Sequence, residues 1–244
     1  MRKIVAILLF LTLSPMAFAG EQEVRIDADW GTLYGTLAVP EEGATTAVVI
    51  VAGSGPTDRN GNSSLQITTY AYKMLSDALV DKGYAVLRYD KRAIGMSLAP
   101  REVVLSAVFS DFVDDAALCV DYLRNAGYDK VVVAGHSEGG MVALHLALRD
   151  NVAVDGIVLL SAAGYPMDTI LMRQLSAQLM PSYMGLMVSA TDIIQRLKRG
   201  EDVAEAGLPR ELIALVRPSA RPYLRGDLTT DPAELIAKVE CPTL

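Results

Sequence analysis

The sequence predicts an α/β protein built on a mostly parallel sheet, and two observations carry this prediction. Short apolar runs, typical of strands buried on both faces, alternate along the chain with longer segments of helical periodicity. The clearest unit is the apolar run 131–134, followed by residues 135–139 (GHSEG) and a helical segment that ends near Leu148. A chain of 244 residues is expected to form one domain.

The other elements of the core follow in chain order. Residues 23–26 and 32–39 flank Trp30-Gly31 and predict an N-terminal hairpin, since apolar and polar residues alternate in the second segment. Further buried strands are expected at residues 47–51, 84–89 and 154–160. Helices are expected at residues 64–81 and 106–125, and each is followed by a glycine, Gly83 or Gly127, that can end it.

The pentapeptide at residues 135–139 fits the pattern G-x-S-x-G, which forms a nucleophile elbow when a strand precedes it and a helix follows. The tight turn requires small neighbours, and Gly135 and Gly139 provide them. Ser137 would lie at the N-terminus of a helix, where N–H groups favour developing negative charge. We therefore expect Ser137 to be a nucleophile; the alternative is a structural Gly-Ser turn.

The elbow, a glycine-rich loop at Gly53 and the segment 90–97 (DKRAIGMS) together resemble the serine hydrolases of the α/β-hydrolase superfamily, from about residue 24 to the C-terminus. The resemblance implies an eight-stranded, mostly parallel sheet with helices on both faces. It also implies ester or amide hydrolysis through a Ser-His-acid triad, without a metal or another cofactor. Segment 90–97 resembles the loop D-x-R-G-x-G-x-S, with Ala93 in place of a glycine; Asp90 and Arg92 are expected to hold loops together.

The same resemblance assigns the oxyanion hole. One backbone N–H comes from the residue after the nucleophile, here Glu138, and the second from a loop after an earlier strand. Ser54 occupies that second position, and Ala52 stands where related enzymes carry a histidine. Gly53 and Gly55 would let the backbone approach a substrate closely. The alternative is a plain glycine turn.

From Pro166 to about Asp231 the pattern changes to helices, expected at residues 167–180 and 186–197. α/β-Hydrolases insert a helical cap at this place. The predicted division is a signal peptide at 1–19, an α/β-hydrolase core at 20–165, a cap at 166–231, and the start of the C-terminal part of the core at 232–244. Residues 237–244 resemble the lead into another strand.

The sequence offers no histidine that is suitably placed to act as the catalytic base for Ser137. Only two histidines are present. His136 should point away from the hydroxyl of Ser137, and His145 lies eight residues along the helix, about 12 Å away at 1.5 Å per residue. The family order is serine, acid, histidine, so we expect both missing groups beyond residue 244 of a truncated chain or fragment; the alternative is a degenerate hydrolase that lacks them. Asp168 is a less favoured candidate for the acid.

The N-terminus predicts export. Arg2 and Lys3 precede an apolar run at 4–13 and the small-residue site at 17–19, which indicates a signal peptide cleaved after Ala19; the alternative is an uncleaved anchor. Cleavage would change the formal net charge from −7 to −9, and no membrane anchor would remain. An acidic protein is not expected to bind nucleic acid.

Two cysteines, Cys119 and Cys241, could pair in an exported protein. However, Cys119 shares a helical face with Phe112, Ala116 and Leu123, which favours a buried free thiol.

The sequence as a whole favours a periplasmic or secreted carboxylesterase-like enzyme that acts on a small ester or acyl substrate. The alternatives are a peptidase on the same fold and a non-catalytic binding protein.

Overall fold

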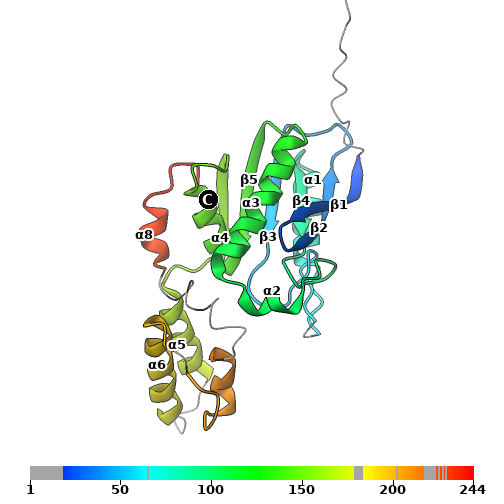
Figure 1. The fold of residues 1–244 in the computed structure, drawn as a ribbon. Helices are drawn as coiled ribbons and strands as arrows, with labels where there is room; N and C mark the ends of the chain where they lie inside the picture. The colour runs from blue at the N-terminus through cyan, green and yellow to red at the C-terminus, as the bar shows by residue number, and fades with distance from the viewer. Residues whose placement is uncertain are drawn as a thin grey trace, which may run out of the picture.

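A six-stranded sheet lies at the centre of the structure, a computed structural model that describes residues 19–64, 66–178, 184–201, 203–216 and 230–244, with Leu224, Gly226 and Leu228 (Figure 1). The strand order is β1-β2-β4-β3-β5-β6. The hairpin β1–β2 is antiparallel and joins β4 in antiparallel fashion, whereas β4, β3, β5 and β6 are parallel. The strands are β1 (Gly20–Ala28), β2 (Gly31–Val39), β3 (Thr46–Val51), β4 (Ala85–Tyr89), β5 (Lys130–His136) and β6 (Gly156–Leu160).

Helices cover both faces of this sheet, as the apolar runs predict. Val48 and Ile50 of β3 pack against α1 (Ala71–Val80), whereas Val49 and Val51 face α3 (Phe109–Asn125) and α4 (Glu138–Ala147). Alternate residues of one strand therefore enter two hydrophobic layers. The predicted mostly parallel α/β architecture is confirmed.

The last residues of the chain lie beside β6. The N–H of Ile157 donates to the carbonyl of Pro242 at 2.9 Å, and the N–H of Leu244 donates back to the carbonyl of Ile157 at 3.0 Å. Thr243 forms a parallel bridge with Ile157. Residues 242–244 therefore pair with β6 in the parallel manner expected of the predicted strand. The described residues form six of the eight strands that the resemblance implies.

Two predicted helices begin later than their periodicity suggested. In place of a helix from residue 64, the side chain of Asn62 accepts the N–H groups of Thr69 and Tyr70, and Tyr70 adopts a left-handed conformation with φ of 51°. The helix expected from residue 106 begins at Phe109, as α3, because Asp111 accepts the N–H of Val108 at 2.7 Å and caps the helix there. A separate, shorter helix, α2 (Arg101–Ser106), precedes it.

The cap region has a hydrophobic cluster of its own. It contains α5 (Met167–Gln178), α6 (Met184–Lys198) and the 3₁₀ helix η2 (Arg210–Leu215), and α8 (Pro232–Ile236) follows it. Both predicted cap helices are present within the described residues; residues 179–180 lie outside them, and the boundaries at 166 and 231 stay predictions. The buried members of the cluster are Ala190, Ile193, Leu197, Val203, Leu212, Val216 and Leu228.

Other predictions concern the termini and the cysteines. Nearly all of the predicted signal peptide, residues 1–18, lies outside the described residues. Within the described part, no helix combines the length and the apolar character needed to cross a bilayer. Cys119 and Cys241 are free, as predicted, and Cys119 is fully buried. Burial raises the pKa of the Cys119 thiol well above its ordinary value.

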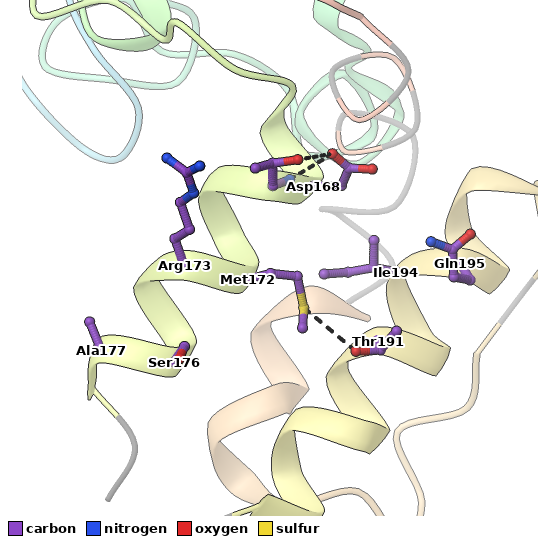
Figure 2. A pocket seen from close by; sticks show the side chains of 9 residues that line it. Asp168, Met172, Arg173, Ser176, Ala177, Thr191, Ile194 and Gln195 are labelled. Carbon is purple, nitrogen blue, oxygen red and sulfur yellow. Dashed lines mark hydrogen bonds between the residues drawn. The ribbon is translucent and has the colours of Figure 1, made fainter.

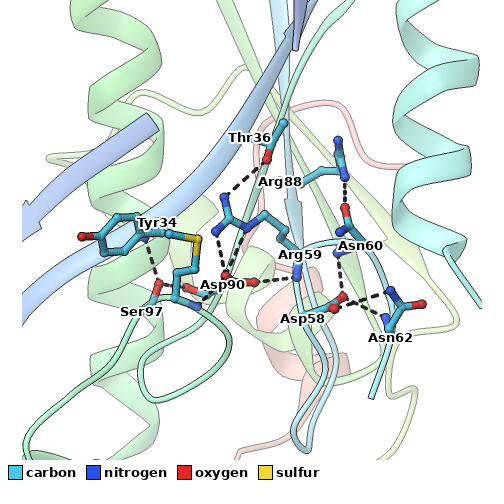
Figure 3. A network of polar contacts seen from close by, with 10 residues as sticks. Tyr34, Thr36, Asp58, Arg59, Asn60, Asn62, Arg88, Asp90 and Ser97 are labelled. Carbon is cyan, nitrogen blue, oxygen red and sulfur yellow. Dashed lines mark hydrogen bonds and ion pairs between the residues drawn. The ribbon is translucent and has the colours of Figure 1, made fainter. Parts of the chain in front are cut away.

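Asp90 and Arg92 hold loops together, as the resemblance predicts. Asp90 accepts the N–H and the Nε–H of Arg59, at 2.8 and 3.1 Å, and also the N–H of Met96 at 3.0 Å (Figure 3). Arg92 donates to Asp115 from Nε at 2.8 Å and from Nη2 at 2.9 Å. The residues that flank Lys91 are thus each bound to a different segment.

Removing the Asp90 carboxylate should destabilise the fold strongly. Asp90→Ala leaves the guanidinium of Arg59 buried without its counter-ion, which costs about 3–5 kcal/mol. The control is Asp77→Ala, which breaks an exposed pair with Lys73 worth about 1 kcal/mol or less. Urea denaturation of both variants measures the difference. A loss for Asp90→Ala no larger than that of the control would contradict this account.

Candidate functional site

Ser137 lies in a strained turn between β5 and α4. Its φ of 54° and ψ of −117° are rarely adopted by a residue other than glycine. A side chain at Gly135 would overlap the backbone of Gly139, and one at Gly139 would overlap the carbonyl of Val51. The N–H of Ser137 donates to the carbonyl of Leu160 at 2.9 Å. The predicted strand, tight turn and helix are therefore present, with the glycines where the turn needs them.

The structure brings together the three residues predicted to form the site. A Cβ added to Gly53 would lie 3.1 Å from the Cβ of Ser137, so the glycine-rich loop lies directly against the serine. Ser54, Ser137 and Glu138 line one cavity. Within the described part of the chain, the N–H groups of Ser54 and Glu138 meet no hydrogen-bond acceptor. Two backbone donors are thus available near the serine.

The cavity at Ser137 has a volume of about 390 Å³ and is lined by the elbow, the glycine-rich loop, the segment after β6 and α5. Its floor comes from the elbow and the loops, and α5 supplies Met167, Ile170 and Leu171. These side chains make one wall mainly apolar. The other residues that line it are Ser161, Ala162, Ala163, Gly164, Gln174 and Leu224.

His136 is held by Tyr72 of α1. Its Nδ1 lies 2.9 Å from the Tyr72 hydroxyl, which also accepts the N–H of Gly53 at 3.2 Å. Which of the two groups donates in this pair depends on the tautomer of His136. Burial raises the pKa of Tyr72, although the Gly53 hydrogen bond opposes this. His136 therefore supports the loop at Gly53 and is not placed as a base for Ser137.

His145 lies half-buried on α4, near Phe109 and Arg149. Its ring meets the edge of Phe109, with centroids 5.2 Å apart, and its Nε2 has no hydrogen-bond partner within the described residues. Burial, followed by the charge of Arg149, lowers the pKa of His145 and thus favours the neutral ring. Together with the spacing along α4, this leaves Ser137 without a histidine in reach.

Asp168 faces a different groove, between α5 and α6 (Figure 2). It forms an ion pair with Lys198 at 2.5 Å and accepts the N–H of Thr169 at 2.6 Å. Burial opposes ionisation of Asp168, but hydrogen bonds from Lys198 and Thr169 hold the pKa of its carboxyl below the ordinary value. Its partners are thus a lysine and a backbone amide, and the structure gives no support to Asp168 as the catalytic acid.

The sequence reasoning missed Tyr72 and Lys91. Tyr72 lies in the predicted helix at 64–81, where an aromatic residue suits ordinary core packing. Lys91 lies in the recognised loop 90–97, yet only its neighbours were assigned roles. Its buried ammonium group contacts the carbonyl of Gly53. A lysine within an otherwise familiar loop was the available signal.

Comparison with known proteins identifies a matching family and several structures of similar fold. The family model for serine aminopeptidase, S33, matches residues 67–223. An esterase from Pyrococcus furiosus is 16% identical, with a TM-score of 0.57 over 92% of this chain and 68% of that chain. An esterase from Thermogutta terrifontis is 22% identical, with a TM-score of 0.52 over 91% of this chain and 78% of that one.

A proline iminopeptidase from Mycobacterium smegmatis is 16% identical, with a TM-score of 0.56 over 91% of this chain and 80% of that chain. At these identities the structural likeness establishes the fold alone. No curated protein matches the chain. Because the family model spans more than half of its residues, the chain belongs to the serine aminopeptidase S33 family of α/β-hydrolases.

Proposed function

We propose that this hydrolase cleaves carboxylic esters through an acyl-enzyme on Ser137. The observation that supports this most is the strained placement of Ser137 at a cavity with an apolar wall, beside the unpaired N–H groups of Ser54 and Glu138. A nucleophile and two oxyanion donors are the parts that acyl transfer requires around one reacting carbon.

In the proposed reaction, the hydroxyl oxygen of Ser137 attacks the acyl carbon while a base accepts its proton. The carbonyl oxygen becomes an oxyanion, which accepts hydrogen bonds from the N–H groups of Ser54 and Glu138. Collapse of the tetrahedral intermediate releases the alcohol and leaves the acyl group on Ser137. Water then attacks the acyl-enzyme by the same route and releases the carboxylic acid.

The base is proposed to come from beyond residue 244, together with the catalytic acid. This rests on the family order of serine, acid and histidine, and on the positions of the two histidines in the printed sequence. His136 is paired with Tyr72, and the ring of His145 packs against Phe109. Neither is placed to accept the proton of Ser137.

A peptidase is the second candidate, because the family name and one structural relative point to peptide substrates. An aminopeptidase needs an anion for the substrate's amino group. Among the described residues that line the cavity, Glu138 is the sole carboxylate, and it already faces the ammonium of Lys91 at 4.0 Å. The apolar wall from α5 also favours an ester. Parallel assays with p-nitrophenyl acetate and proline p-nitroanilide separate the two candidates.

Export is proposed from the N-terminal pattern. Strand β1 begins at Gly20, and Glu21 pairs with the buried Arg88 at 2.5 Å, so cleavage after Ala19 would leave these contacts intact. We expect N-terminal sequencing of the protein recovered outside the cytoplasm to begin at Gly20. Recovery of protein that still begins at Met1 would contradict a cleaved signal peptide.

Loss of the Ser137 hydroxyl should remove activity from the full-length protein, with any native sequence that follows Leu244. Ser137→Ala should lower kcat/KM for p-nitrophenyl acetate at least about 10³-fold and abolish labelling by a fluorophosphonate, because the variant lacks the proposed nucleophile. The control is Ser106→Ala, at an exposed helix end. Full activity of Ser137→Ala would favour a different nucleophile, and an inactive, unlabelled parent protein would favour a binding function.

Substitutions at Ser54 should distinguish its backbone from its side chain. Ser54→Ala keeps the N–H and should change kcat by less than about threefold, because the hydroxyl has no proposed role. Ser54→Pro removes the N–H and should raise the barrier by about 3 kcal/mol, as for a lost oxyanion donor. Kinetics with p-nitrophenyl acetate and thermal unfolding measure both effects. Equal activity of the two variants in folded protein would exclude this N–H as a donor.

A further inference from the structure

One buried ammonium group contacts both segments that carry the proposed oxyanion donors. Lys91 follows β4 and is 6% exposed. Its Nζ donates to the carbonyl of Gly53, in the loop before Ser54. The same Nζ lies 4.0 Å from Oε1 of Glu138, the first residue of α4. Lys91 therefore joins the glycine-rich loop to the start of the helix behind the serine.

The contact of Lys91 with the Gly53 carbonyl also sets the direction of the Ser54 N–H. The carbonyl of Gly53 and the N–H of Ser54 belong to one planar peptide group, and the described residues contain no cis peptide bond. In a trans peptide these two bonds point in opposite directions. A donor that holds the Gly53 carbonyl on one side therefore fixes the Ser54 N–H on the other side.

Tyr72 holds the neighbouring peptide group. The N–H of Gly53 donates to the Tyr72 hydroxyl at 3.2 Å, so both peptide groups that flank the Gly53 Cα have a side-chain partner. A Cβ at Gly53 would lie 3.1 Å from the Cβ of Ser137 and 3.2 Å from Nδ1 of His136, so a side chain there would crowd both residues. Glycine is also the residue with the greatest backbone freedom. Tyr72 and Lys91 therefore restrain the backbone at Gly53, which as a glycine would otherwise be free to adopt many conformations.

The position of Lys91 is itself fixed by its surroundings. Asp90 is bound to Arg59 and Arg92 to Asp115, so the backbone on both sides of Lys91 is anchored. Its ammonium lies 6.0 Å from the centre of the Phe112 ring. Burial lowers the pKa of Lys91, and the nearby charge of Glu138 opposes this. A charge held this rigidly can orient a dipole without reorganisation.

We propose that Lys91 is a positioning residue for ester hydrolysis: its ammonium group holds the Gly53–Ser54 peptide with the Ser54 N–H directed at the oxyanion, and its pairing with Glu138 ties that loop to the second donor. This inference rests on the proposed function, because the oxyanion exists only if Ser137 attacks an acyl group. Lys91 acts through the backbone and need not touch the substrate.

The kinetic test uses Lys91→Met in the full-length protein. With p-nitrophenyl acetate, kcat should fall about 100-fold or more while KM changes less than about threefold, since the lost interaction serves the transition state. The matched control is Lys73→Met, which removes an exposed lysine that pairs with Asp77 and should leave both constants within about twofold. An unchanged kcat, or a loss expressed only in KM, would overturn the proposal.

A second variant covers the case in which Lys91→Met unfolds because Glu138 is left buried without a partner. The double variant Lys91→Met/Glu138→Gln removes both charges and should restore the unfolding midpoint of the parent protein. Its kcat should stay as low as expected for the single variant, because the Gly53 carbonyl still lacks its donor. Recovery of the parent kcat in the double variant would overturn the proposal.

The motion of the Ser54 N–H separates this inference from the proposed function. Fluorophosphonate labelling of Ser137 in the parent protein tests the function alone. Independently, the NMR order parameter of the Ser54 N–H should be clearly lower in Lys91→Met, or in the double variant, than in Lys73→Met, because the Gly53–Ser54 peptide has lost its donor. An unchanged order parameter would refute the positioning role of Lys91 whatever the kinetics show. A lowered order parameter in a protein that is not labelled would retain the positioning role and reject the proposed reaction.

Discussion

The backbone strain at Ser137 is the constraint on which the rest of the site depends. A serine at positive φ costs about 1–3 kcal/mol and persists only where its surroundings enforce it. Three neighbouring parallel strands do so. β5 delivers the serine, β6 accepts its N–H through Leu160, and the end of β3 lies so close to Gly139 that no side chain fits there. The strained turn at Ser137 is therefore maintained by the positions of β3, β5 and β6 as neighbours in the sheet.

Charged groups complete the site by fixing the loops around the turn. Within the run Asp90-Lys91-Arg92, each side chain binds a different segment: Arg59, the Gly53 carbonyl and Asp115, respectively. All three are buried, so their interactions are weakly screened by water. One short loop after β4 thereby holds the glycine-rich loop on one side and α3 on the other. Such buried interactions stabilise the fold at Asp90 and, in our proposal, align the Ser54 N–H through Lys91.

Sequence was informative wherever the signal was local. Strands buried on both faces appear as continuous apolar runs, and the elbow glycines stand within two residues of Ser137. Ala93, where the related loop carries glycine, has φ of 67°, so the departure seen in the sequence marks a real left-handed position. The starts of α1 and α3 were misplaced because Asn62 and Asp111 cap or divert the backbone through side-chain contacts that periodicity does not contain.

The remaining parts of the site depend on contacts distant in sequence. Gly53 meets Tyr72 and Lys91, which lie 19 and 38 positions away, and neither residue type by itself indicates a role. Likewise, the contact between the rings of His145 and Phe109 follows from how α3 packs on α4. Such pairings are set by the folded sheet, so they could be found only in three dimensions.

The most direct measurement is a crystal structure of the full-length protein after reaction with a small fluorophosphonate. The account predicts a covalent bond from phosphorus to the hydroxyl oxygen of Ser137. One phosphonyl oxygen should lie about 2.7–3.1 Å from the backbone nitrogens of both Ser54 and Glu138. An adduct on another residue, or a phosphonyl oxygen turned away from both nitrogens, would contradict it.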